Sequence, residues 1–211
     1  MHIVAEAIVV AVRPHGEHGA IVRALTRRDG VRAGYVRGGR SRRLRPVLVP
    51  GNRIQAEFRA RGDEQLATLA AELIHSRAFL LSEPLAAAGI EWAAALTAAA
   101  LPEAQPYPRV HDGLEGLLGA IEAAPSARGW AVALVRYELL VLAELGFGLD
   151  AGALGGLPAR LRGGATPGWP TIRQGLSISG HRLARDLLTQ RQAAVLAGRE
   201  RLIDRLDRIA G

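Results

Sequence analysis

The segment RIQAEFRAR at residues 53–61 alternates apolar and polar side chains without interruption. Successive side chains of a β-strand lie on opposite faces, so this alternation places the apolar members on one face and the polar members on the other. The pattern predicts an antiparallel strand that is buried on one side and solvated on the other. The buried face would consist of Ile54, Ala56, Phe58 and Ala60.

Four further strands are predicted around this one, at residues 6–12, 20–26, 31–37 and 65–73. Turn residues separate them, as in PHG at residues 14–16 and RDG at residues 28–30. Five short strands in about 70 residues suit a small closed barrel of the OB type, and a five-stranded open sheet has the same pattern. The clustering of positive charge favours the barrel, because OB barrels bind single-stranded nucleic acids in basic grooves.

From Ser82 onward the apolar residues recur at helical spacing. Helices are predicted at residues 85–101, 110–123 and 128–145, with one or two more at residues 181–211. Gly146 is placed to end the third helix, and residues 147–180 are rich enough in Gly and Pro to be predicted irregular. The predicted fold class is therefore α+β, with an N-terminal five-stranded OB-type β-barrel at residues 1–78 and an all-helical C-terminal domain at residues 79–211.

The basic residues explain why a polyanionic ligand is expected. All 27 of them are Arg, and the formal net charge is +7. Residues 1–81 contain 14 Arg and 7 acidic residues, so this part of the chain carries the whole surplus. Guanidinium groups pair with phosphates and release the counterions of nucleic acids, so the clustering predicts phosphate binding. The alternative interpretation is an ordinary solvated face in a protein that uses Arg for every basic residue.

The candidate nucleic-acid-binding residues come from this cluster. Gly38 and Gly39 precede the densest group of Arg, and a flexible loop there can lay several guanidinium groups along a strand without fixed shape. Tyr35 is included because an exposed aromatic ring can stack on a base, although a core position is an equally good interpretation. The full set is Arg23, Arg27, Arg32, Tyr35, Arg37, Arg40, Arg42, Arg43 and Arg45.

Composition argues against several kinds of chemistry. The chain has no cysteine for thiolate catalysis or iron–sulfur ligation, and no lysine for a phosphate-binding P-loop or a Schiff base. His15 and His18 have the spacing of a metal-binding pair, but no third ligand can be named, so neither a metal nor another cofactor is expected. Because no nucleophile elbow and no carboxylate cluster for Mg²⁺ is found, the protein is not expected to be an enzyme.

A membrane location is not expected either. The longest stretch without a charged residue runs over eleven residues, 92–102, whereas a membrane-spanning helix needs about 20. The N-terminal residues lack the basic region of a secretory signal, so a cytoplasmic location is expected.

Four segments in a defined order resemble the RecO family of bacterial DNA repair proteins. They are RPHGE at residues 13–17, LT at residues 25–26, GGRS at residues 38–41, and LVRYELL at residues 134–140 followed by LGF at residues 145–147. No single segment is specific to this family, but the order and spacing of the four segments are. The resemblance covers residues 1 to about 150.

The resemblance implies a recombination mediator of the RecF pathway with an N-terminal OB domain. Such a protein binds single- and double-stranded DNA and anneals strands. It is implied to cooperate with RecR and with the C-terminal tail of single-strand DNA-binding protein (SSB), so that the recombinase RecA is loaded onto the coated strand. Two features depart from the family: residues 150–180 lack the cysteine-based zinc module of many members, and the basic Ser-Arg ending of the chain is missing.

Arg136 is the candidate for binding the partner peptide. It is predicted to lie in an almost entirely apolar helix, where a buried charge needs an acid or a ligand beside it. The resemblance points to the helical domain as the docking place of the acidic SSB tail, so Arg136 is assigned to a carboxylate of that tail. An ion pair with Glu115 or Glu122 of another helix is the alternative. An RNA- or ribosome-associated OB-fold binding factor is the alternative function.

Overall fold

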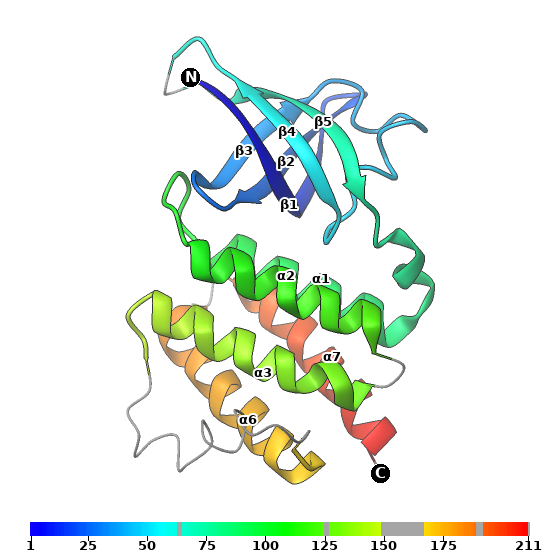
Figure 1. The fold of residues 1–211 in the computed structure, drawn as a ribbon, viewed down its shortest axis with the longest axis vertical. Coiled ribbons are helices and arrows are strands. Elements are labelled where there is room, and N and C mark those ends of the chain that lie inside the picture. The colour runs from blue at the N-terminus through cyan, green and yellow to red at the C-terminus, as the bar shows by residue number, and fades with distance from the viewer. Residues whose placement is uncertain (63–64, 125–126, 149–166, 189–191, 211) are drawn as a thin grey trace.

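The computed structural model describes residues 1–62, 65–124, 127–148, 167–188 and 192–210. Its N-terminal part is a closed barrel of five strands, which lies above the helices in Figure 1. The strands are β1 (His2–His15), β2 (Gly19–Thr26), β3 (Gly30–Val36), β4 (Arg53–Arg59) and β5 (Ala67–His75).

Strand pairing closes the barrel. β1 pairs antiparallel with β4 through its first half and with β2 through its second half. β3 pairs in parallel with β5 at Gly34–Ala67 and Tyr35–Thr68, and β5 pairs antiparallel with β4. The order β1-β2-β3-β5-β4 confirms the predicted OB-type barrel and excludes the open sheet.

β1 contributes to two hydrophobic cores because its successive side chains point to opposite faces. Ala7 and Val9 are buried inside the barrel. Ile8 and Val10 belong to the other core, together with Ile90 of the helical part. The helices therefore cover one side of the barrel, as Figure 1 shows.

The remainder of the described chain is helical. The elements are a 3₁₀ turn η1 (Ala78–Ser82), α1 (Pro84–Ala100), α2 (Pro108–Ala123), α3 (Ala127–Glu144), α6 (Trp169–Arg182), a π-helical turn η2 (Leu183–Leu187) and α7 (Ala193–Ala210). In Figure 1, α1 and α2 lie next to the barrel, and α3, α6 and α7 lie on the side away from it. Gly146 follows α3 with a φ of 85°, a left-handed conformation that ends a helix and suits glycine.

The expectation of irregular chain at residues 147–180 is wrong for its last part. Residues 169–180 belong to α6, and Pro170 stands in the first turn of that helix, where its missing N–H costs nothing. Proline and glycine in a sequence usually indicate a break in a helix, whereas this proline stands where a helix begins. Residues 149–166 of the same segment lie outside the described residues.

A buried arginine joins the barrel to the helices. The side chain of Arg77 is 3% exposed and donates to the backbone oxygen of Gly51 at 2.8 Å. It also pairs with two carboxylates of α2, those of Glu115 at 2.7 Å and Glu122 at 3.2 Å. The backbone N–H of Arg77 donates to Asn52 Oδ1 at 2.8 Å. Because these partners come from the end of the β3–β4 connection and from α2, Arg77 holds the two parts of the chain in one orientation.

None of the helices in the described ranges is both long enough and apolar enough to cross a bilayer.

Candidate nucleic-acid interface

The Arg-rich connection between β3 and β4, residues 37–52, is a folded loop. Its backbone forms successive turns, in which Arg45 N–H donates to the Ser41 oxygen and Leu48 N–H to the Leu44 oxygen, both at 3.0 Å. Leu48 is buried in the barrel core, and Asn52 Nδ2 donates to the backbone oxygen of Pro46 at 2.9 Å. The loop is therefore anchored to the barrel by its apolar residues.

The arginines of this loop point into solvent. Arg37, Arg42, Arg43 and Arg45 are exposed, and within the described part of the chain their side chains make no hydrogen bond or ion pair. Arg40 is also exposed, and its Nη1 donates to the backbone oxygen of Glu17 at 3.0 Å. A carbonyl partner leaves the positive charge of Arg40 unneutralised. These five arginines therefore present positive charge without carboxylates paired to them.

A hollow of about 420 Å³ lies between this loop and the barrel. Its lining combines apolar side chains with two of the exposed arginines. The lining residues are Val12, Pro14, Ala20, Gly39, Arg40, Arg45 and Leu48.

Two other predicted residues lie elsewhere, at the junction with the helices. Arg23 of β2 donates to the backbone oxygen of Ala98 in α1, and its Nε is 3.2 Å from Glu103 Oε1. Arg27 forms a bidentate pair with Asp112 of α2, with both N–O distances at 2.9 Å. The structure therefore does not gather Arg23 and Arg27 with the loop arginines, and it gives both of them carboxylate partners.

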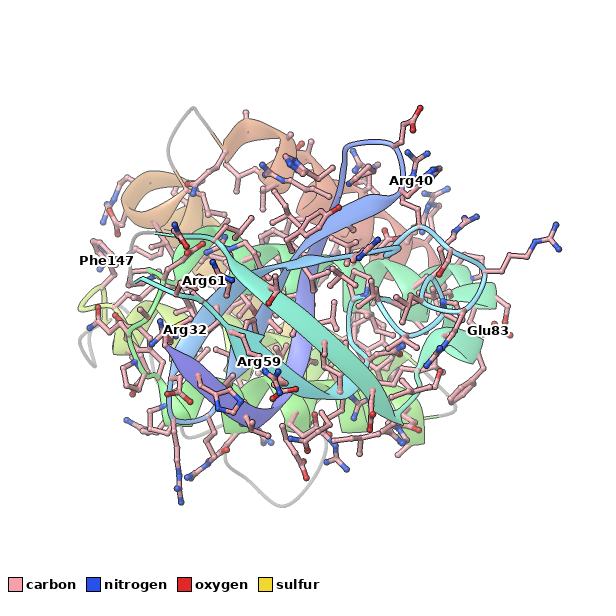
Figure 2. The ribbon with its side chains drawn as sticks, turned by 90° about the horizontal axis from the view of Figure 1, so that it is seen from above. Arg32, Arg40, Arg59, Arg61, Glu83 and Phe147 are labelled. Carbon is pink, nitrogen blue, oxygen red and sulfur yellow. The ribbon has the colours of Figure 1, made fainter. Side chains whose placement is uncertain are left out.

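Arg32 is also separate from the loop. Its Nε donates to the backbone oxygen of Asp29 at 3.1 Å. Figure 2 places Arg40 on one side of the barrel and Arg32, Arg59 and Arg61 on the other. Arg59 pairs with Glu57 at 2.6 Å, so part of the charge on that second side is neutralised.

Tyr35 is partly exposed and lies beside the β1–β2 hairpin. Its ring meets the His15 ring edge to face, with 5.8 Å between the ring centroids. A Cβ atom at residue 19 would come within 2.4 Å of the Tyr35 hydroxyl, so the close approach of this ring requires Gly19. Tyr35 therefore does not occupy the core position that was the other interpretation of this residue.

One exposed arginine of this surface was not among the predicted residues. Arg13 of β1 is opposite Ile21 of β2, which is opposite Tyr35 of β3, so the three side chains lie on the same outer face of the barrel. Arg13 is exposed. Its place at the start of the RPHGE segment was the signal that could have identified it.

Arg136 is exposed on α3, which corrects the expectation of a buried charge. Glu115 and Glu122, the two acids named as alternative partners for it, both pair with Arg77. A second hollow, of about 660 Å³, lies between α6, η2 and α7. Its walls include the apolar Leu176 and Ile203 as well as charged side chains.

No group of three potential metal ligands occurs among the residues that the structure describes. His15 and His18, the pair considered from the sequence, are both exposed, and His18 lies 3.8 Å from Glu17.

Comparison with known proteins adds two matching family models. The model described as "Recombination protein O N terminal" matches residues 1–77, and "Recombination protein O C terminal" matches residues 65–153. A DNA repair protein RecO from Rhodospirillum centenum is 40% identical over 95% of this chain and 92% of that protein. The RecO of Gluconacetobacter diazotrophicus is 35% identical over 96% and 94%, and that of Phenylobacterium zucineum is 45% identical over 69% and 59%.

Proposed function

The chain belongs to the RecO family of DNA repair proteins, and from that premise we propose that it is a non-enzymatic recombination mediator that holds DNA through its phosphates. The observation that supports this most is the β3–β4 loop, whose exposed arginines have no carboxylate partners within the described residues. A phosphate backbone supplies the missing anions, and guanidinium groups bind phosphates through two hydrogen bonds.

The proposed binding does not depend on the base sequence of the DNA. Phosphate contacts position a nucleic acid without reading its bases, so the same loop can hold a single strand or a duplex. Each contact is weak and exchanges with counterions, which lets the protein release one strand and accept another. Such exchange suits strand annealing, because annealing requires two strands to be held together and then released.

Partner binding is the second part of the proposal. We propose that the helical part binds the acidic C-terminal tail of SSB, with Arg136 as the candidate cation, and that the protein cooperates with RecR. A tail contact raises the local concentration of the protein at SSB-coated strands, so recombinase loading there needs no nucleotide hydrolysis by this chain.

Titration with three nucleic acids tests the DNA proposal. Fluorescence anisotropy is measured with a single strand, a duplex of the same sequence and a structured RNA, each at two salt concentrations. The test variant is Arg42→Gln combined with Arg43→Gln, and the matched control is Arg128→Gln combined with Arg201→Gln, which removes the same charge from exposed positions of α3 and α7.

The loop variant should weaken binding of both DNAs and reduce the slope of log K against log salt by about 1.4 to 1.8, at ~0.7–0.9 per lost phosphate contact. The control should keep the wild-type slope. Equal effects of the two variants would show that general charge, not the loop, drives binding. Tighter binding of the structured RNA than of single-stranded DNA would favour the alternative of an RNA- or ribosome-associated factor.

A further inference from the structure

The hollow beside the β3–β4 loop is lined by residues near the end of β1 and the start of β2, so it lies at one end of the barrel, here called the mouth. Val12 and Ala20 line it from neighbouring strands, and Leu48 of the loop closes it from the other side. Ala20 and Leu48 are 1% and 4% exposed and belong to the hydrophobic core of the barrel. The floor of the hollow is therefore apolar and offers no charge to a ligand.

The rim of the hollow is basic and held in place. Arg40 N–H donates to the His18 oxygen at 3.1 Å, and its guanidinium donates to the Glu17 oxygen at 3.0 Å. A Cβ atom at Gly39 would come within 2.9 Å of the Ala20 Cβ, so the loop lies too close to the barrel there for any other residue without a shift. Arg40 is therefore fixed above the mouth, and Arg45 lines the same hollow.

We propose that this hollow receives the base of an unpaired nucleotide, while Arg40 and Arg45 bind the phosphates on either side of it. An apolar floor cannot solvate a phosphate, and a purely apolar ligand leaves the two rim cations without partners. A nucleotide matches both parts, because the flat faces of its base pack on apolar side chains while its polar edge stays towards the rim and solvent, and because its phosphates are anionic. The volume lies within the ~300–1,000 Å³ range of pockets for small ligands, and barrel mouths are frequent places for them.

This inference rests on the proposed function and adds strand selectivity to it. In a duplex each base is stacked and paired, so a base would have to be unpaired and unstacked before it could enter the hollow. A base of a flexible single strand enters without that cost. Phosphate contacts by the rest of the loop would still hold either form of DNA, so the hollow would add affinity for single strands alone.

The test compares two strands with the same phosphates. One is a thymidine oligonucleotide, and the other has the same length but carries abasic tetrahydrofuran sugars in place of the nucleosides. Binding of each strand is measured by fluorescence anisotropy, and the ratio of the two dissociation constants is the readout. General electrostatic effects act on both strands and cancel in this ratio.

Wild-type protein should bind the abasic strand about five-fold or more weakly, the fold-change that corresponds to burial of ~40 Å² of apolar base surface at ~25 cal/mol per Å². The test variant is Pro14→Glu, which places a carboxylate at the exposed edge of the hollow, and it should bring the ratio close to one. The matched control is Val4→Glu on the same strand, at a side chain that is 59% exposed and does not line the hollow, and it should keep the wild-type ratio.

A second readout follows the base itself. A single 2-aminopurine in the thymidine strand should change in fluorescence on binding wild type and Val4→Glu, and change less with Pro14→Glu. Equal affinity of wild type for the two strands, or a ratio that Pro14→Glu leaves unchanged, would overturn the base-binding inference while phosphate binding stands. Failure of wild type to bind either strand would instead overturn the proposed function.

Discussion

Arg199 of α7 donates two hydrogen bonds to the carboxylate of Glu138 on α3, at 2.8 and 2.9 Å. Glu138 is fully buried and also accepts hydrogen bonds from Trp92 Nε1 of α1 and from Ser179 of α6. Although burial lowers the pKa of Arg199, the Glu138 carboxylate raises it, and the net direction is upward. One carboxylate therefore connects α1, α3, α6 and α7.

We predict that Glu138→Gln lowers the free energy of unfolding by ~3–5 kcal/mol, because the substitution removes the buried carboxylate that is hydrogen-bonded to the Arg199 guanidinium. Urea unfolding followed by circular dichroism measures the effect. Arg185→Ala is the control, since Arg185 forms an ion pair with Asp186 at 2.7 Å but is exposed, and loss of such a pair costs at most about 1 kcal/mol. Similar costs for the two variants would contradict the prediction.

Arg77→Met should destabilise the protein by ~3 kcal/mol or more, because it leaves the partly buried Glu115 and Glu122 close together without the cation between them. Methionine keeps most of the side-chain volume, so a cavity is not the cause. Hydrogen exchange should rise at the β3–β4 connection near Gly51 and in α2. If urea unfolding and exchange both match the wild type, Arg77 does not hold the barrel to the helices.

The Arg27–Asp112 pair predicts a dependence of stability on acid pH. Hydrogen bonds from Arg27 and then from His111 lower the pKa of Asp112 from 3.8 to about 2. A carboxylate whose pKa is lower in the folded protein stabilises it above the unfolded pKa, and this contribution is lost as pH falls from 3.8 to about 2. Asp112→Asn should therefore show a smaller fall in the urea midpoint over that range. An unchanged pH profile would mean that the pair contributes nothing in solution.

Arg27→Gln should leave the affinity for single-stranded DNA within about two-fold of wild type, because Asp112 already neutralises this guanidinium. Arg43→Gln removes one charge as well, but from the unpaired loop, and it should weaken binding and lower the salt slope by ~0.7–0.9. Anisotropy titrations at several salt concentrations separate the two. Equal losses would show that the junction arginines also contact DNA.

Arg136→Ala should weaken binding of a peptide with the sequence of the SSB tail, measured by isothermal titration calorimetry. Ala184→Glu is the informative comparison, because Ala184 is exposed and lines the hollow between α6 and α7, where a new carboxylate would repel an acidic peptide. We expect Ala184→Glu to bind as wild type does. If instead Ala184→Glu weakened peptide binding and Arg136→Ala did not, the peptide would dock in that hollow and not at Arg136.

Much of the fold was predictable because the relevant patterns are local. The alternation at residues 53–61 and the helical spacing after Ser82 indicate which side of each element is buried, and Gly146 indicates where α3 ends. Element ends were less predictable: β1 runs over His2–His15 because both of its halves find partner strands, which no window of sequence reveals. The start of α6 at Trp169 was missed because proline there begins a helix.

A small barrel with a surplus of arginine, followed by helices, can be predicted from residue patterns alone. Which of those arginines remain available to a phosphate depends on how the chain folds. Arg27 is hydrogen-bonded to Asp112, which is 85 residues away in the sequence, whereas Arg42 and Arg43 pair with no anion among the described residues. Charge follows from composition, whereas the pairing of charges depends on distances between atoms that only folding brings together.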